Sequence, residues 1–434
     1  MTISRRNLIK YTTAAAAGAA VLGTSTLASA AQKQTAKVMP KKGKRIVVLG
    51  GGWGGCTAAK YAKMEDPSIE VILVEKDPKF ISCPISNLVI GGQKKMSDIT
   101  FTRDNLAKNY GIKIVYTEAV ALDAVSKKLT TVDGTIEYDK LIISPGISYA
   151  YDTIEGLDSP AAIAKFPAAF KAGPETVALR NMLVAMKPGG VVVMSVPPTP
   201  YRCPPGPYER ASLIANYLKK HKPGSKIIIC DANDDVTSKG PLFKKAWADY
   251  YQGILEYVPD SQVTKVDMST GVITTEKGEI KSAVANIIPT MKAGQSAFDL
   301  GLMNKPEDTF VRADAFTFES YNFKDVYVIG DATHNGAVGG VPKSGYVANS
   351  MGKVCASAVV RTLNGLEPVE PSLANTCYSM VNDDEAIFVS AVYKYDYNIK
   401  KIVSASGGVS PKREKLFAKH EEDWALGIWN DMLG

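Results

Sequence analysis

Short apolar runs alternate with stretches of helical periodicity along most of this chain. The first run, Arg45–Leu49, is followed by a glycine cluster at 50–55, a helical pattern over 57–64 and a second apolar run at 70–74. Short runs of β-branched residues are typical of buried strands, so this order predicts a strand–helix–strand unit with parallel strands. Further strands are predicted at 113–116, 140–144, 191–196, 226–230, 285–288 and 326–329.

The order of these units predicts the domain organisation. A second strand–helix–strand unit begins near residue 190, and a strand that ends in Gly330-Asp331 comes much later. Strands that alternate with helices form α/β domains with parallel sheets. We therefore expect an α/β fold with two Rossmann-like dinucleotide-binding domains, the first discontinuous and the second inserted into it, followed by a C-terminal domain. A length of 434 residues is sufficient for this number of domains.

The N-terminal residues have the features of an export signal. Arg5 and Arg6 precede a weakly apolar, Ala-rich run, and Ala28-Ser29-Ala30 offers the small residues of a cleavage site. Paired arginines are typical of the twin-arginine route. The sequence thus predicts a signal peptide at 1–30, a flexible leader at 31–43 and a periplasmic location for the mature protein.

Composition and charge exclude two classes of partner. The chain is 45% hydrophobic and 22% charged, as in ordinary globular proteins. Its formal charge is +7, and removal of the predicted signal, with three basic residues and no acidic ones, leaves 48 basic against 44 acidic, or +4. The sequence has no basic stripe with interleaved aromatics, so we expect no nucleic-acid partner. Beyond the signal no run approaches about 18 apolar residues, so we expect no membrane span.

The glycine cluster after the first strand has the spacing of a dinucleotide-binding turn. Gly50, Gly52 and Gly55 form the G-x-G-x-x-G pattern, and Glu75 ends the next strand. The first glycine allows a tight turn, the second lets a pyrophosphate approach the backbone, and the third lets helix and strand pack closely. The helix N-terminus offers N–H groups to the phosphates, and the carboxylate of Glu75 can accept from ribose hydroxyls.

Three later segments distinguish FAD from NAD. The segment 326–332 resembles the second flavin motif of the glutathione-reductase-like superfamily, in which the Asp, here Asp331, binds the ribityl chain. The segment 138–146 resembles the hinge strand of the same superfamily. A helix that begins near Lys343, Ser344 and Gly345 would direct its positive end towards the flavin and stabilise the reduced anion. We therefore predict FAD as the cofactor.

In the second strand–helix–strand unit, the turn after the first strand, at 191–196, has a different composition. Five prolines lie between 197 and 205, where a second glycine pattern would begin. Proline lacks the N–H that a phosphate would use and cannot form the close turn, so nicotinamide binding is expected to be lost. The expected domains are an FAD-binding domain at 44–150 and 300–365, a degenerate NAD-like domain at 151–299 and a C-terminal interface domain at 366–434.

The six cysteines fall into two groups. Cys56, Cys230 and Cys355 lie in apolar helical or strand patterns and are expected to be buried packing residues. The other three lie in segments rich in Pro or Asn that read as irregular, which marks them for chemistry; they are Cys83, Cys203 and Cys377. The sequence has no C-x-x-C-H haem site and no zinc-like spacing, so no metal site is expected.

Longer strings around these cysteines carry a specific resemblance. The strings are C-P-P-G-P-Y-E-R-A-S from residue 203, P-K-S-G-Y from 342 and N-T-C-Y-S from 375. Over about residues 44–393 the chain resembles the flavoprotein subunit of flavocytochrome c sulfide dehydrogenase. The resemblance implies that Cys83 bonds covalently to the flavin 8α-methyl group. It also implies that Cys203 and Cys377 form a redox disulfide over the flavin ring.

The implied reaction is oxidation of a small inorganic sulfur substrate. Hydrosulfide attacks the disulfide to give a persulfide and a thiolate, electrons pass to FAD, and a c-type cytochrome subunit or soluble cytochrome c accepts them. Arg210, Lys343 or the flavin-facing helix end could stabilise the thiolate and the reduced flavin.

Three alternatives to this reading stay open. One is a sulfide:quinone oxidoreductase, another is an accessory flavoprotein of a sulfur-oxidation system, and the third is a purely structural disulfide. The tail at 412–434 has its basic residues before its acidic ones, which favours a capping helix or dimer contact over a membrane-lying helix.

Overall fold

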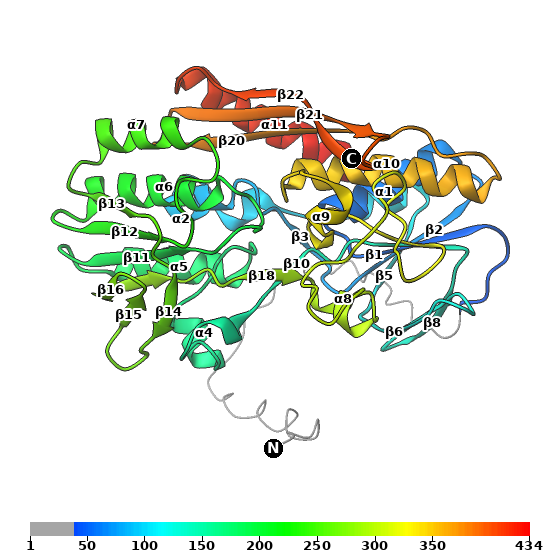
Figure 1. Ribbon diagram of the computed structural model, residues 1–434, viewed down its shortest axis with the longest axis horizontal. Coiled ribbons are helices and arrows are strands. Elements are labelled where there is room, and N and C mark those ends of the chain that lie inside the picture. The colour runs from blue at the N-terminus through cyan, green and yellow to red at the C-terminus, as the bar shows by residue number, and fades with distance from the viewer. Residues whose placement is uncertain (1–38) are drawn as a thin grey trace, which may run out of the picture. The chain divides into compact units, whose positions relative to one another are not determined.

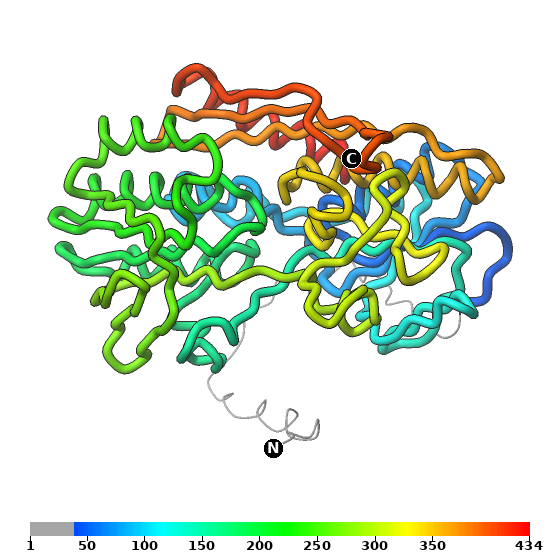
Figure 2. The backbone as a smooth tube through the Cα atoms, viewed as in Figure 1, coloured from blue at the N-terminus to red at the C-terminus, as the bar shows by residue number. Residues whose placement is uncertain are grey.

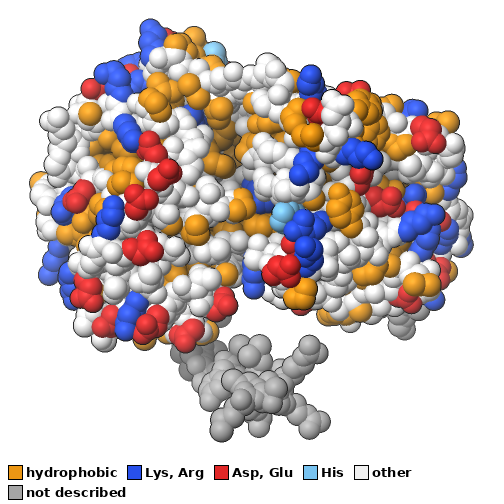
Figure 3. Space-filling view, viewed as in Figure 1, with side chains coloured by type: hydrophobic (Ala, Val, Ile, Leu, Met, Phe, Trp, Pro, Cys, Tyr) orange, Lys and Arg blue, Asp and Glu red, His pale blue; other side chains and the backbone are white. Residues whose placement is uncertain are grey.

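The structure is a computed structural model that describes residues 39–434. The predicted signal peptide and most of the predicted leader lie outside these residues. Within the described part of the chain, no helix is long and apolar enough to cross a membrane. On the face drawn in Figure 3, Lys and Arg side chains are interspersed with Asp and Glu, and no continuous basic stripe is visible.

The first sheet is parallel and has the strand order β19-β9-β1-β2-β5. Its residues are buried on both faces: Ile46 and Val48 face a core that includes α1 and α10, while Val47 and Leu49 face the meander β6–β8. Burial on both faces explains why these strands are continuous apolar runs. The elements are β1 (Arg45–Leu49), α1 (Trp53–Glu65), β2 (Glu70–Glu75), β5 (Lys113–Tyr116), β6 (Ala119–Asp123), β7 (Lys128–Thr131), β8 (Gly134–Glu137), β9 (Lys140–Ile143), β19 (Val326–Val328) and α10 (Gly345–Leu363).

The second sheet is also parallel, with the order β13-β12-β11-β17. The antiparallel pair β10 and β18 marks where the chain enters and leaves this region, which Figures 1 and 2 draw in green. The meander β14–β16 packs on one face of the sheet. The elements are β10 (Ile147–Tyr149), α4 (Pro160–Lys165), α5 (Pro174–Ala185), β11 (Val191–Val196), α6 (Gly206–His221), β12 (Lys226–Asp231), α7 (Gly240–Tyr250), β13 (Leu255–Val258), β14 (Val263–Val266), β15 (Val272–Thr275), β16 (Gly278–Lys281), β17 (Val284–Asn286) and β18 (Met291–Ala293).

The C-terminal region forms an antiparallel sheet and a long helix. The strands β20 (Ser372–Met380), β21 (Ala386–Asp396) and β22 (Lys401–Val409) pair in sequence order, and α11 (Lys415–Leu433) packs on β20, β21 and α1. Strand β20 contacts both α6 and α10, so this sheet extends over both parallel sheets (Figure 1). Shorter elements complete the fold: β3 (Phe80–Ile81), α2 (Ser86–Gly91), β4 (Thr100–Phe101), α3 (Asp104–Tyr110), α8 (Gln295–Asp299) and α9 (Asn335–Val338).

The predicted fold class is confirmed. Strand β19 joins the first sheet beside β9, although the whole second sheet lies between them in sequence. The predicted strands agree closely in position with the observed ones, and the largest shift places the strand expected at 285–288 at Val284–Asn286. The domain boundaries stay a prediction.

Candidate functional site

A cavity of about 520 Å³ lies where the two parallel sheets meet the C-terminal sheet. Segments from every part of the described chain contribute to its wall, so the cavity exists only when all three regions fold together. Its wall includes Gly51, Gly52, Trp53, Glu75, Cys83, Arg103, Arg202, Cys203, Glu209, Asp331, Ser344, Gly345, Cys377, Glu421 and Trp424.

The glycine turn between β1 and α1 combines tight backbone packing with one open position. Gly50 has a φ of +99°, and a Cβ there would lie 2.3 Å from the carbonyl oxygen of Ser144. A Cβ at Gly55 would lie 1.8 Å from the carbonyl oxygen of Gly50. A Cβ at Gly52 would meet nothing within 4 Å, and Gly52 lines the cavity. The turn therefore leaves free the backbone that a pyrophosphate would approach.

Glu75 and Arg103 brace this turn from the side. The Glu75 carboxylate accepts a hydrogen bond from the N–H of Gly51 at 2.5 Å. The Nε of buried Arg103 donates to the Gly51 carbonyl at 2.9 Å, and its Nη2 lies 3.8 Å from Glu75 Oε2. Nothing in the sequence pattern marked Arg103, because a single arginine after a short strand carries no spacing signal.

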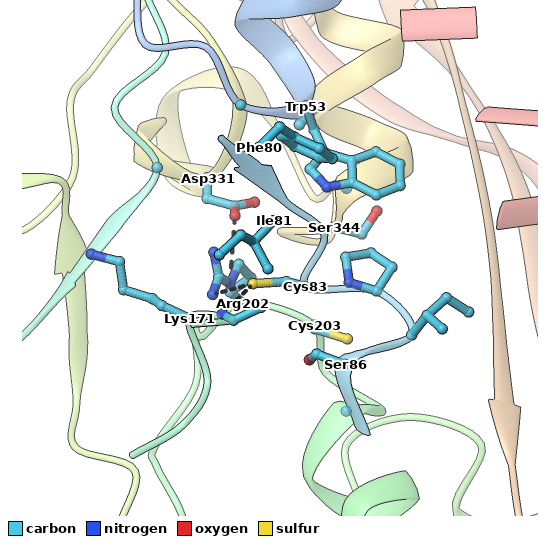
Figure 4. A pocket seen from close by; sticks show the side chains of 18 of the residues that line it. Trp53, Phe80, Ile81, Cys83, Ser86, Lys171, Arg202, Cys203, Asp331 and Ser344 are labelled. Atoms are coloured by element: carbon cyan, nitrogen blue, oxygen red, sulfur yellow. Dashed lines mark hydrogen bonds and ion pairs between the residues drawn. The ribbon is translucent and has the colours of Figure 1, made fainter. Parts of the chain in front are cut away.

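Asp331, Arg202 and Cys83 form a connected polar group in the cavity wall (Figure 4). The Oδ1 of buried Asp331 has no hydrogen-bond partner among residues 39–434, and burial raises the pKa of this carboxyl. Arg202 Nε lies 4.0 Å from Asp331 Oδ2, and Arg202 Nη2 donates to Cys83 Sγ at 3.1 Å. The N–H of Ala172 also donates to Cys83 Sγ at 3.1 Å. The Cys83 sulfur therefore accepts two hydrogen bonds from N–H groups and is held in the cavity wall.

The start of α10 lies in the cavity wall, but Lys343 lies behind it. Ser344 caps the helix, since its Oγ accepts from the N–H of Val347 at 3.1 Å, and Gly345 gives room for the Trp53 ring, 2.9 Å from where its Cβ would be. Lys343 is buried, donates to the carbonyls of Asp331 and Thr333, and does not line the cavity. Burial lowers the pKa of Lys343 to about 7.

Cys203 and Cys377 meet in the cavity from opposite ends of the chain. Cys203 lies in the proline-rich turn with a φ of +56°, and its N–H donates to the Lys343 carbonyl at 2.7 Å. Cys377 was expected in an irregular segment; this was wrong, because it lies inside strand β20. Both are free thiols, and a hydrogen bond between them raises the pKa of Cys203 and lowers that of Cys377.

Lys239 is a buried cation beside Cys377. Its ammonium donates to the carbonyl of Cys377 at 3.2 Å and to Ser379 Oγ at 2.8 Å. Burial lowers the pKa of Lys239, and the neighbouring thiol and carboxyl groups oppose that shift. Its charge in turn favours the Cys377 thiolate. Sequence reasoning gave Lys239 no role, because the loop before α7 comes near β20 only in the folded chain.

The remaining candidates are buried side chains. Arg210, expected as a possible thiolate partner, lines the cavity, and its guanidinium donates to Asn87, Asn286 and the carbonyls of Ala168 and Ala169. Its role towards a thiolate stays a prediction. Cys56, Cys230 and Cys355 are fully buried in the apolar cores, as expected. Within residues 39–434 no cluster of His, Cys, Asp and Glu could hold a metal ion.

Comparison with known proteins decides the family. A family model described as "Sulfide dehydrogenase (flavocytochrome c) flavoprotein chain, central" matches residues 176–289, and one described as "Flavocytochrome c sulphide dehydrogenase, flavin-binding" matches 369–433. Over 46 residues the chain is 56% identical to the sulfide dehydrogenase (flavocytochrome c) flavoprotein chain of Chlorobaculum thiosulfatiphilum, covering 96% of that relative and 11% of this chain. The chain belongs to the family of flavocytochrome c sulfide dehydrogenase flavoprotein chains.

Other similarities of this flavoprotein chain extend over most of its length. A "Pyridine nucleotide-disulphide oxidoreductase" model matches residues 44–171. The mitochondrial sulfide:quinone oxidoreductase of Dictyostelium discoideum is 24% identical over 331 residues, which cover 72% of this chain and 70% of that relative. The crystal structure of the sulfide:quinone oxidoreductase from Aquifex aeolicus has a TM-score of 0.69 at 18% identity and covers 90% of this chain and 92% of that chain, which shows a shared fold.

FAD is the cofactor of this flavoprotein chain. The observed residues fit it: an open glycine turn at a helix N-terminus suits the pyrophosphate, and the unsatisfied Oδ1 of Asp331 suits a sugar-alcohol hydroxyl.

Proposed function

We propose that this chain is an FAD-dependent sulfide dehydrogenase in which sulfide reacts at Cys203 and Cys377 and electrons leave to a c-type cytochrome. One observation carries the proposal. Two cysteines far apart in sequence converge in the cavity that the dinucleotide turn and Asp331 also line. A buried thiol pair beside a cation is suited to thiol–disulfide exchange.

The bound flavin supplies an acceptor that takes electrons in pairs and releases them singly. Gly52, Glu75, Asp331 and the start of α10 would hold it, and Cys83 would bond to it covalently. The position of Cys83 in the cavity wall supports that bond, because two N–H donors hold its sulfur in place there. Acid precipitation tests it: the yellow colour is expected to stay with the polypeptide, and free FAD in the supernatant would refute the covalent bond.

The site favours a particular order of bond changes in the oxidised cysteine pair. Hydrosulfide attacks Cys203 Sγ, the S–S bond breaks, and its electron pair leaves with Cys377 as a thiolate while Cys203 carries the persulfide. The thiol of lower pKa is the better leaving group, and Lys239 lies beside Cys377 to stabilise its charge. Overall each hydrosulfide loses two electrons and one proton.

Replacement of either cysteine tests the proposal. Cys203→Ser and Cys377→Ser are each expected to abolish sulfide-dependent flavin reduction with FAD still bound, because serine offers neither an electrophilic sulfur nor a leaving thiolate. Cys230→Ala, in strand β12, is the matched control and is expected to react like the wild type. NADH is expected to leave the flavin oxidised. Rapid-mixing absorbance measures all four, and normal reduction in both serine variants would contradict the mechanism.

The sulfide:quinone oxidoreductases remain a second candidate class, because relatives named sulfide:quinone oxidoreductase and sulfide-quinone reductase match 72% and 80% of this chain. Turnover with cytochrome c and with a soluble quinone, measured on one preparation, separates the two. Faster turnover with cytochrome c is expected, and no turnover with either acceptor would favour an accessory role.

We also propose export to the periplasm by the twin-arginine route. The paired arginines and the Ala-x-Ala sequence support it. Replacement of Arg5 and Arg6 by Lys is expected to retain flavin-loaded protein in the cytoplasm. Unchanged export of that variant, measured by cell fractionation, would contradict this route.

A further inference from the structure

A second cavity of about 460 Å³ lies between α2 and α11, next to the cavity described above. Its wall contains apolar side chains such as Leu88, Leu426 and Trp429. Two residues, Ile85 and Glu421, line both cavities. Glu421 is therefore the ionisable side chain at the boundary between them. Charged side chains that face the second cavity are Lys94, Asp98, Asp383, Asp384, Lys415, Lys419 and Glu422.

Glu421 is paired with a second buried carboxyl group. Its side chain hydrogen-bonds that of Glu209, and both residues are almost fully buried, at 4% and 6% exposure. Glu209 Oε2 accepts from Asn87 Nδ2 at 2.7 Å, and its Oε1 accepts from the N–H of Met380 at 2.9 Å. Unlike the oxygens of Glu209, Glu421 Oε2 accepts no hydrogen bond from an N–H or hydroxyl donor among residues 39–434.

These contacts determine which carboxyl group holds a proton. Both oxygens of Glu209 accept hydrogen bonds from N–H groups, which favours its ionised form. Two buried carboxyl groups in contact cannot both ionise at neutral pH, so Glu421 carries the proton and donates it to Glu209. The directions of their pKa shifts agree: burial raises both, and the mutual hydrogen bond lowers the pKa of Glu209 and raises that of Glu421. Five other ionisable groups on this side interact with the pair: Cys203, Arg210, Lys239, Cys377 and Tyr378.

The cysteine chemistry requires a route for protons. Each hydrosulfide that becomes zero-valent sulfur releases one proton and two electrons. The electrons go to the acceptor, but a proton left beside a buried ammonium group would be strongly destabilised. The Glu209 carboxylate lines the same cavity as the cysteines and can accept it.

We propose that Glu209 and Glu421 form a proton-sharing pair that takes up the proton released at the cysteines and delivers it through Glu421 to the second cavity. The resting pair holds one proton, holds two after uptake, and returns to one when Glu421 releases a proton outwards. The uptake step rests on the proposed function, whereas the shared proton of the resting pair does not.

Infrared spectroscopy of the oxidised protein without sulfide tests the shared proton. At neutral pH the wild type is expected to show a carboxylic acid C=O band that shifts in D₂O. Glu421→Gln, which keeps the shape and an N–H donor to Glu209, is expected to lose this band. Asp423→Asn is the matched control, because Asp423 lies on the same helix, is exposed and lines neither cavity. Absence of the band in the wild type, or its persistence in Glu421→Gln, would overturn the proposal.

Stopped-flow mixing with sulfide tests proton delivery. A pH-indicator dye is expected to show prompt proton release in the wild type and in Asp423→Asn, and release about 100-fold slower in Glu421→Gln. Glu421→Asp is expected to restore part of the rate. Equal rates in Glu421→Gln and Asp423→Asn would refute delivery through Glu421. A wild type that shows the acid band but no reduction by sulfide would refute the proposed function and the uptake step, and leave the shared proton intact.

Discussion

The two dinucleotide-like units place opposite chemistry at the same position of the fold. In the first, the turn from β1 to α1 is made of glycines, and Gly52 leaves open space on the cavity side. In the second, the turn from β11 to α6 holds five prolines between 197 and 205. Prolines provide no N–H donors for a phosphate. The first turn is therefore able to bind a pyrophosphate, and the second serves to position Cys203.

The acidic residues that end the second strand of each unit show the same contrast. Glu75 lines the cavity and accepts from the N–H of Gly51. Asp231 is fully buried, and its Oδ2 accepts hydrogen bonds from Tyr208 at 2.7 Å and Tyr257 at 3.0 Å. The two tyrosine hydroxyls thus hydrogen-bond to the carboxylate. In a nucleotide-binding unit, a carboxylate at this position would accept hydrogen bonds from a ribose. At this position the second unit therefore has a buried polar core, where the first has a carboxylate at a cavity.

The largest expected effect is the loss of FAD binding on substitution of Gly55 in the first turn. Gly55→Ala would place a Cβ 1.8 Å from the carbonyl oxygen of Gly50, so the turn must open and FAD binding is expected to be lost. Gly427→Ala in α11 is the control, because a Cβ there would meet nothing within 4 Å. The ratio of flavin absorbance to protein absorbance in the purified variants measures the effect. Full FAD content in Gly55→Ala would show that the turn is not the binding element.

Substitution of Gly206, at the end of the second turn, is expected to slow the reaction with sulfide and to leave FAD binding unchanged. Gly206→Ala would place a Cβ 2.9 Å from Cys203 Sγ and 2.8 Å from the Phe170 ring, which displaces the sulfur. Flavin reduction by sulfide is expected to slow by about 100-fold with FAD retained, since small misplacements of reacting groups have effects of this size. Gly240→Ala, where the nearest contact is an ordinary 3.4 Å, should react normally in the same rapid-mixing assay. Loss of FAD from Gly206→Ala would contradict the division of roles.

The sequence was informative where the signal is local. The glycine pattern predicted the first turn, and apolar runs predicted the strands of both parallel sheets, because each feature depends on neighbouring residues. Sequence reasoning missed Lys239, Arg103 and Glu421, whose roles arise from contacts between distant segments. It also read the segment around Cys377 as irregular, because the polar residues of β20 face other polar groups and show no apolar alternation.

A smaller effect, on stability, is expected when a tyrosine hydroxyl that hydrogen-bonds Asp231 is removed. Tyr208→Phe removes a hydrogen bond to buried Asp231, and we expect it to lower the free energy of unfolding by about 1–3 kcal/mol. Tyr217→Phe, on the same helix, is the control, since among residues 39–434 the hydroxyl of Tyr217 makes no hydrogen bond. Urea unfolding followed by circular dichroism measures both. Equal stability of the two variants would mean that solvent replaces the lost hydroxyl.

The smallest expected effect is on how stability depends on pH, and it distinguishes buried Asp231 from exposed Asp235. Burial raises the pKa of Asp231, so the folded state binds its proton more tightly than the unfolded state does. Wild-type stability therefore falls as pH rises from the unfolded pKa through the folded pKa. Asp231→Asn removes this penalty, so relative to the wild type it is expected to gain stability between acid and neutral pH. Below the unfolded pKa this difference should vanish.

Asp235, in the loop that follows β12, is the matched control, and its effect on stability is expected to have the opposite sign. Its ion pair with Lys244 and a hydrogen bond from the N–H of Val236 lower its pKa, so its contribution to stability is present at neutral pH and is lost as pH falls through the folded pKa. Asp235→Asn is thus expected to lose stability at neutral pH and to match the wild type in acid. Urea midpoints for both variants across that pH range measure the two trends. If the urea midpoints of the two variants changed with pH in the same way, Asp231 would not be a buried charge in the folded protein. The contrast with Glu75 would then not hold.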